Sequence, residues 1–205
     1  MWVDVFSDNA FDENCWVIAA EGGEDAVVVD PGFAPERVRG MLERAGQRAV
    51  AVLATRGHHD HVVAAADLCG DDLPFVIHEA DALALTDPTA WGAGYGVGPQ
   101  DVKDLRPVAD GDVLRFAGFT IHVLHTPGHT PGSVLYRTDG WVLSGDVVFA
   151  GAIGRSDFPN SSAEAMERSL DRFLGLPDDL DVFPGHGPRT SVGRERATNP
   201  YLRGR

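Results

Sequence analysis

The chain has 205 residues, a length that suits one domain with a sizeable core, and we expect residues 1–205 to form a single domain. Its 31 acidic and 17 basic residues give a formal net charge of −14. This balance argues against a nucleic-acid-binding surface, because such a surface needs a basic patch. The acidity favours solubility and carries no information about the fold.

The cysteines and the apolar segments of the chain indicate in which cellular compartment we expect the protein. Cys15 and Cys69 form no CxxC pair and suggest no disulfide framework. The segment Met1–Phe6 lacks the basic and apolar regions of a secretory signal, and no apolar run is long enough to span a membrane. We therefore expect a cytoplasmic protein that binds neither nucleic acid nor membranes. The sequence leaves the oligomeric state open.

Short apolar segments, separated by Asp, Asn or Gly turns, dominate the first part of the chain. A helix is predicted where Pro and Glu begin an 11-residue amphipathic segment. The predicted strands are Val3–Phe6, Cys15–Ala20, Ala26–Asp30, Ala49–Ala54 and Phe75–His78, and the predicted helices are Pro35–Ala45 and His61–Leu68.

The segment Thr86–Val108 differs from its surroundings, because glycines and prolines interrupt any periodic pattern in it. Long irregular segments in compact domains often have a function. With Trp91 and Tyr95 it suits a lid over a pocket, and it suits a surface connection equally well. We predict no regular structure for it.

The remainder of the chain shows the same succession of short strands and helices as the first part. Strands followed by helices occur in both halves, and several strand pairs resemble hairpins. This order predicts two sheets packed together with helices outside, an α+β arrangement. The predicted strands are Asp112–Phe116, Phe119–His125, Ser133–Arg137, Trp141–Ser144 and Asp181–Phe183, and the predicted helices are Ala163–Leu174, with Ser162 as N-cap, and Val192–Ala197.

Histidine and aspartate follow four of these strands directly. Glycine in the same turns lets the backbone approach an ion closely. Zinc sites use small sets of imidazole nitrogens and carboxylate oxygens, so four strand ends with this chemistry predict a metal centre. The candidate ligands are His58, Asp60 and His61 in ATRGHHDH, His129 in HTPGHTPGS, Asp146 in VLSGDVVF and His186 in VFPGHGP.

Several segments resemble the metallo-β-lactamase fold superfamily and, within it, single-domain glyoxalase II-like (hydroxyacylglutathione hydrolase-like) enzymes. The resemblance runs nearly from end to end and implies a four-layer αββα sandwich with a metal centre at one edge. It rests on Phe11 with Asn14-Cys15, Val29–Gly32, residues 55–61, Thr126–Gly132, Ser144–Asp146, Gly154–Pro159, Phe183–Pro188 and Glu195-Arg196 with Asn199-Pro200.

The resemblance implies two metal sites that share Asp146. The first site would use position 56, His58 and His129, and the second site would use Asp60, His61 and His186. In such a centre a metal-bound hydroxide attacks a carbonyl, and the metal stabilises the oxyanion. We assign Asp60 a catalytic role as well, because it can orient the hydroxide. Asp30, in VVVDPG, is expected to hold the metal-binding loop by hydrogen bonds.

Arg56 departs from the family pattern, His-x-His-x-Asp-His, at its first histidine. A guanidinium has no acceptor lone pair and stays protonated, so it cannot bind a metal. At about 5 Å and an effective dielectric near 20, it repels each unit of metal charge by roughly 3 kcal/mol. We predict one ion, zinc, in the complete second site and a weak or empty first site. Iron and manganese are alternatives, and His59 is not expected to replace the lost ligand.

The leading functional hypothesis is a metal-dependent hydrolase that cleaves small hydroxyacyl thioesters. A persulfide dioxygenase of this fold holds one iron at the positions of Arg56, His129 and Asp146, and here one of the three is lost. A true β-lactamase usually has Cys or Ser in place of Asp146. The third alternative is a metal-impaired, non-catalytic member that binds thioesters or a protein partner.

Overall fold

The first half of the chain forms a six-stranded sheet. The computed structural model describes residues 1–7, 11–87 and 101–205. The strand order is the chain order, antiparallel from the first strand to the third and parallel from the third to the sixth. The strands are β1 (Trp2–Ser7), β2 (Asn14–Ala19), β3 (Asp25–Val29), β4 (Arg48–Leu53), β5 (Phe75–His78) and β6 (Leu105–Val108).

The second half forms another six-stranded sheet, in the order β14-β13-β10-β9-β8-β7, and a small hairpin. Only β10 and β13 are parallel neighbours in it. Its strands are β7 (Val113–Phe116), β8 (Phe119–His125), β9 (Val134–Arg137), β10 (Trp141–Gly145), β13 (Asp181–Pro184) and β14 (Thr190–Ser191), and the hairpin pairs β11 (Val148–Phe149) with β12 (Ala152–Ile153).

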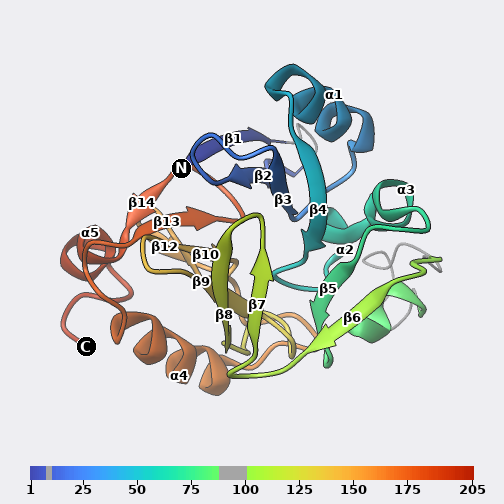
Figure 1. The fold of residues 1–205 in the computed structure, drawn as a ribbon. Coiled ribbons are helices and arrows are strands. Elements are labelled where there is room, and N and C mark those ends of the chain that lie inside the picture. Colours follow the sequence, from blue (N-terminus) through green and yellow to red (C-terminus); the bar gives the residue numbers. More distant parts are fainter. Residues whose placement is uncertain (8–10, 88–100) are drawn as a thin grey trace.

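Helices cover the outer faces of the two sheets, as Figure 1 shows. The first sheet carries α1 (Pro35–Ala45), α2 (His59–Val62), α3 (Ala65–Cys69) and the 3₁₀ turn η1 (Ala82–Leu85). The second sheet carries α4 (Ala163–Leu174) and α5 (Val192–Thr198). The predicted αββα sandwich is therefore confirmed. In the part of the chain that the structure describes, every helix is too short or too polar to cross a bilayer.

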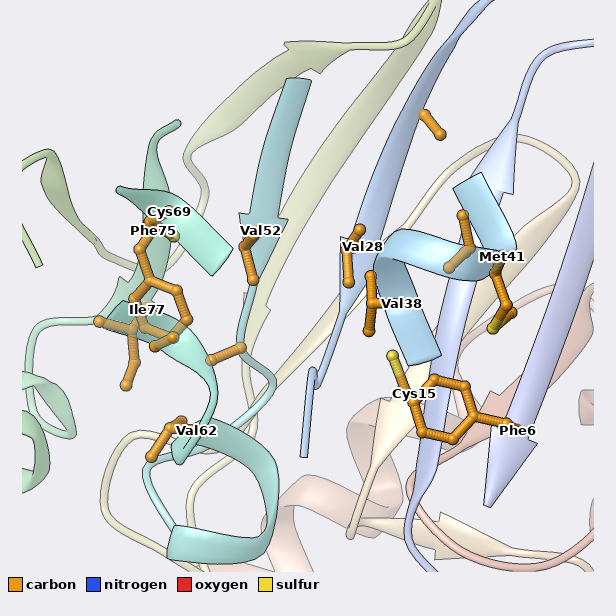
Figure 2. Close-up of a cluster of buried hydrophobic side chains, with 14 of the residues drawn as sticks. Phe6, Cys15, Val28, Val38, Met41, Val52, Val62, Cys69, Phe75 and Ile77 are labelled. Carbon is orange, nitrogen blue, oxygen red and sulfur yellow. The ribbon is translucent and has the colours of Figure 1, made fainter. Parts of the chain in front are cut away.

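Three separate apolar clusters fill the spaces between the four layers, and strand alternation assigns each residue to one of them. On β2, Cys15 and Val17 pack toward the helices, while Trp16 and Ile18 pack toward the second sheet. Figure 2 shows the first cluster, where Val38 and Met41 of α1 lie against Phe6, Cys15 and Val28 of the sheet. The third cluster lies under α4 and is centred on Met166, Leu170 and Phe173.

Two predicted segments differ from the structure. The single helix expected over His61–Leu68 is wrong, because the Ala64 amide donates to the Gly32 carbonyl at 2.8 Å and the helical ladder is interrupted between α2 and α3. The irregular segment Thr86–Val108 ends in β6, an edge strand that tolerates Pro107 because it pairs on one side only. The proposed lid, with Trp91 and Tyr95, lies outside the described residues.

The carboxyl ends of the parallel strands meet at one edge of the sandwich. Two backbone hydrogen bonds join the halves of the chain there, from the Asn14 amide to the Gly185 carbonyl at 2.8 Å and from the Val134 amide to the Thr55 carbonyl at 2.9 Å. The loops after β4, β8, β10 and β13 are thereby held side by side.

Candidate metal centre

The structure brings all six predicted ligand residues to this edge. Five of them line one pocket of about 230 Å³. The sixth, His61, lies behind the others and is completely buried. The lining residues among them are His58, Asp60, His129, Asp146 and His186.

Five ligand atoms, from the four residues of the second site, lie close to one another. His61 Nε2 lies 3.5 Å from Asp60 Oδ2 and 4.0 Å from Asp146 Oδ1. His186 Nε2 lies 3.6 Å from Asp60 Oδ2 and 3.5 Å from Asp146 Oδ2. Ligand atoms at about 2.0–2.2 Å from a tetrahedral ion are separated by roughly 3.3–3.6 Å, so these spacings come close to those of a zinc site.

The far nitrogens of both histidines have partners that turn the rings inward. Asp30 Oδ2 lies 2.9 Å from His61 Nδ1, and the Asp12 carbonyl lies 3.1 Å from His186 Nδ1. The Asn14 side chain fixes the backbone around His186, because its amide donates to the carbonyls of Pro184 and Gly187 at 3.0 and 2.7 Å. Carboxylate–histidine and carbonyl–histidine pairs of this kind orient imidazoles toward metals.

The first site is arranged differently. His129 Nδ1 faces the Arg155 carbonyl at 2.8 Å, so it bears the proton and its Nε2 lone pair points into the centre. That Nε2 lies only 2.9 Å from His58 Nδ1, which is too short for two ligands of one tetrahedral ion. Burial lowers the pKa of His129 to about 4, and burial with the charge of Arg56 lowers that of His58 to about 2, so both rings are neutral.

Arg56 fills the space between the two sites. Its Nε donates to His58 Nδ1 at 3.2 Å, and its Nη1 forms a close ion pair with Asp146. Its Nη2 lies 3.3 Å from Asp60 Oδ2 and 3.4 Å from His186 Nε2. The guanidinium therefore contacts ligand residues of both sites, which the sequence alone did not reveal.

The carboxylates of the centre are ionised despite their burial. Burial alone would raise the pKa of Asp146. The charge of Arg56, followed by the charges of the neighbouring histidines, has the larger effect, so the pKa of Asp146 is lowered. At Asp60 burial is likewise outweighed, by His61 and then by Arg56. The carboxylates of Asp30 and Asp60 overcome the effects of burial and of Arg56 on His61 and raise its pKa to about 10.

The donors of the second site fit a divalent ion. His61 Nε2 is buried and has no hydrogen-bond partner among the described residues, although it faces two carboxylates. Ligand atoms of Asp60, His61 and His186 all lie within 4.8 Å of one another. The first site does not fit an ion, because position 56 is an arginine. Its Nε–H group donates to His58 Nδ1 and so occupies the lone pair that would bind the metal.

Asp81 was not identified from the sequence, although it ties the two ligand loops together. Its buried carboxylate accepts hydrogen bonds from the Gly57 amide at 2.7 Å, the Thr130 hydroxyl at 2.6 Å and the Gly132 amide at 2.5 Å. Gly57 lies beside His58, and Thr130 lies beside His129. The only sequence signal is that Asp81 lies three residues after the end of β5. The candidate metal ligands likewise lie in loops that follow strands.

Glu13 is a second residue that sequence reasoning missed. It is fully buried, and neither carboxylate oxygen has a hydrogen-bond partner among the described residues. Ligand atoms of Glu13, Asp30 and His61 lie within 4.8 Å of one another. Burial raises the pKa of Glu13 well above its usual range, against the opposing charge of His61.

His59 and Arg155 have structural roles beside the centre. His59 packs its ring against Phe11 and Phe33, with centroids 5.1 and 5.7 Å away, and lies outside both groups of ligand atoms within 4.8 Å. Arg155 pairs with Asp157 at 2.8 and 3.0 Å and so closes a salt-bridged loop.

Two solved structures share this arrangement of sheets and helices. The chain superposes on the B3 metallo-beta-lactamase BLEG-1 with a TM-score of 0.90 and 30% identity, covering 99% of this chain and 100% of the other. It superposes on TTHA1623 in a di-iron-bound form with a TM-score of 0.83 and 36% identity, covering 97% and 100%. TTHA1623, a relative with this fold, therefore binds iron.

Sequence comparison points the same way. The chain is 32% identical over 210 residues to the hydroxyacylglutathione hydrolase GloC of Haemophilus influenzae, with 98% of both chains covered. Residues 8–186 match the sequence profile of the metallo-beta-lactamase superfamily, a span that contains every candidate ligand. The fold binds divalent metals, and this chain carries a matching group of aspartates and histidines. The protein therefore belongs to the metallo-beta-lactamase superfamily.

Proposed function

We propose that this protein hydrolyses small hydroxyacyl thioesters with one divalent ion, zinc in the first instance, held by Asp60, His61, His186 and Asp146. Members of the superfamily are usually hydrolases, and the relative GloC is named for hydroxyacylglutathione hydrolysis. The observation that carries the proposal is a group of four residues whose neighbouring ligand atoms lie 3.5–4.0 Å apart. A thioester carbonyl is electrophilic, so one ion is enough for the reaction.

An ion held by these residues would supply a hydroxide at neutral pH and would polarise the substrate carbonyl. Asp60 remains ionised because His61 and Arg56 hold its pKa low. An ionised carboxylate accepts hydrogen bonds, so Asp60 orients the attacking water from the pocket side. His61 and His186 keep their orientations through Asp30 and the Asp12 carbonyl while the reaction proceeds.

The pocket above these residues suits a small apolar group. Phe11, Phe149, Ile153 and Phe158 form its walls, and the volume of about 230 Å³ limits what can enter. Arg155 stands over the ring of Phe158, with its guanidinium carbon 4.5 Å from the ring centroid. The walls bind the carbon skeleton of the acyl group or thiol and exclude water around the thioester, while the carbonyl faces the histidines.

The dioxygenase alternative is less favoured by the same geometry. An iron held by position 56, His129 and Asp146 would need a lone pair where the Arg56 guanidinium stands. That guanidinium donates to His58 and pairs with Asp146, so two neutral histidines and a shared carboxylate remain. The second site keeps its complete set, and for this reason we propose hydrolysis.

The direct test is elemental analysis of the purified chain combined with turnover of a hydroxyacyl glutathione thioester. We expect about one zinc per chain and hydrolysis that a chelator abolishes. His186→Ala and Asp60→Asn are expected to lower kcat/KM at least a hundredfold, because each removes a metal contact. His122→Ala is the matched control, since His122 lies on β8 and does not line the pocket.

The outcomes separate the alternatives. Oxygen consumption with a persulfide by an iron-loaded chain indicates the dioxygenase and overturns the proposal. Turnover of a β-lactam in place of a thioester indicates the activity named for BLEG-1. A chain that retains no metal and turns over no thioester is a binding protein, and the proposal fails.

A further inference from the structure

Arg56 is among the largest fully buried side chains in the described part of the molecule, with 2% of its surface exposed. A buried guanidinium is tolerated only when its charge is matched and its N–H groups are satisfied. Here the match is made by residues that resemble metal ligands, so the arginine lies where the family pattern would place a cation.

The surroundings of Arg56 explain why a cation is required. Asp30, Asp60 and Asp146 are all buried at this edge of the sandwich, with exposed fractions of 1%, 7% and 5%. Like charges so close together repel one another strongly in a medium of low dielectric. A centre with three buried carboxylates needs positive charge when no metal is bound, and Arg56 supplies it to Asp60 and Asp146.

Arg56 contacts residues of both sites and the carboxylate that they share. Its closest contact is the ion pair with the shared Asp146, and its Nε donates to His58 Nδ1 at 3.2 Å. Its contacts with Asp60 and His186 measure 3.3 and 3.4 Å, beyond the usual range of strong hydrogen bonds. An ion in the second site therefore competes with three long contacts of the guanidinium, those with Asp60, His61 and His186, and shares Asp146 with it.

We infer that Arg56 is a built-in cation that replaces the ion of the first site, so that the metal-free protein keeps its centre assembled and accepts one divalent ion. The inference shares its ligand residues with the proposed function but requires no turnover. It makes Arg56 a positioning residue for Asp146 and His58, where the sequence indicated only a lost ligand.

The test compares metal-free, chelator-treated full-length protein with the variants Arg56→Met and Arg56→His. Removal of one partner from a buried ion pair leaves charge uncompensated, so we expect both metal-free variants to unfold on the order of 10 °C below the wild type. Zinc is expected to raise the midpoint of each variant more than that of the wild type. Titration should end at one zinc per chain in the wild type and at two in Arg56→His.

A control and a third variant keep the test decisive. Arg168→Met removes an exposed arginine whose partner Glu164 is also exposed, and a shift of no more than a few degrees is expected. If metal-free Arg56→Met does not fold, Arg56→Lys takes its place. This variant keeps the positive charge but loses the guanidinium N–H groups, so its unfolding midpoint must lie between those of the wild type and Arg56→His. Equal midpoints for wild type and Arg56→Met, or two zinc ions in the wild type, overturn the inference. Absence of thioester turnover alone overturns only the proposed function.

Discussion

The Asp30 carboxylate and the His61 imidazole form a buried pair, with Asp30 Oδ2 2.9 Å from His61 Nδ1. The same carboxylate accepts hydrogen bonds from the amide and the hydroxyl of Thr55, each at 2.7 Å. Asp30 therefore connects the end of β3 to both ends of the loop that carries Arg56, His58 and Asp60. It holds the backbone with one oxygen and aims the His61 ring with the other.

Asp30→Asn is expected to weaken zinc binding by roughly 10- to 100-fold. The new side-chain NH2 group would face either Thr55 or His61, where a carboxylate oxygen now accepts hydrogen bonds. Competition titration with a chromophoric chelator measures this change. Asp25→Asn serves as the control, since Asp25 pairs with Arg48 at an exposed position. An affinity that is the same in Asp30→Asn and the wild type would show that His61 is aimed by other contacts.

The link through Asp81 predicts a loss of stability. Asp81→Asn places an amide group against three donors, from Gly57, Thr130 and Gly132. A destabilisation of roughly 3 kcal/mol is expected in urea unfolding, because at least one buried donor loses its acceptor. Thr130→Val removes one of these donors and keeps the shape, so it should destabilise by only about 1 kcal/mol. Similar unfolding free energies for Asp81→Asn and the wild type would contradict the role of this link.

Gly185 predicts a steric effect on the metal ligands. A β-carbon at this position would lie 2.3 Å from Asp146 Oδ1 and 3.0 Å from His61 Cε1. Gly185→Ala must therefore move Asp146, and we expect zinc affinity to fall by at least tenfold while the chain still folds. Gly140→Ala is the matched control, because its β-carbon meets nothing within 4 Å. Unchanged zinc affinity in Gly185→Ala would show that Asp146 is dispensable for the second site.

Local sequence patterns were sufficient to predict the layers and the set of candidate ligands. Alternating apolar residues on strands such as β2 place side chains in two different cores, and a polar residue directly after a strand falls at the strand's carboxyl end. The helices Pro35–Ala45 and Ala163–Leu174 have the predicted bounds, and the Ser162 hydroxyl accepts from the Ala165 amide as an N-cap.

Contacts between distant segments could not be predicted in the same way. Asp81 acts on Gly57 and Gly132, which lie 24 and 51 residues away, and no local pattern indicates such a link. The two-residue strands β11, β12 and β14 exist only through their pairing. The sequence identified Arg56 as a missing ligand, but only the packing of both halves shows that its side chain turns into the centre.

A stacked pair of histidines outside the centre predicts how stability depends on pH. His78 is buried against His125, with ring centroids 4.0 Å apart and an interplanar angle of 13°. Its Nδ1 accepts a hydrogen bond from the Ala80 amide at 3.2 Å, which requires a lone pair on that nitrogen. Burial, and then the charge of His125, lower the pKa of His78, against the opposing effects of Glu79, Asp110 and Asp112.

Because the pKa of His78 is lower in the folded state, the unfolded chain binds more protons as pH falls below about 6.5. The contribution of neutral His78 to stability is therefore complete above that pH and is lost toward pH 5, by up to about 1.4 kcal/mol per pH unit. His78→Asn keeps an acceptor for the Ala80 amide and removes the titration. We expect urea unfolding of the metal-free protein between pH 7 and pH 5 to be less pH-dependent in His78→Asn than in the wild type. Equal slopes would mean that His78 becomes protonated as readily in the folded chain as in the unfolded one, so that its stacking on His125 would not oppose the charge.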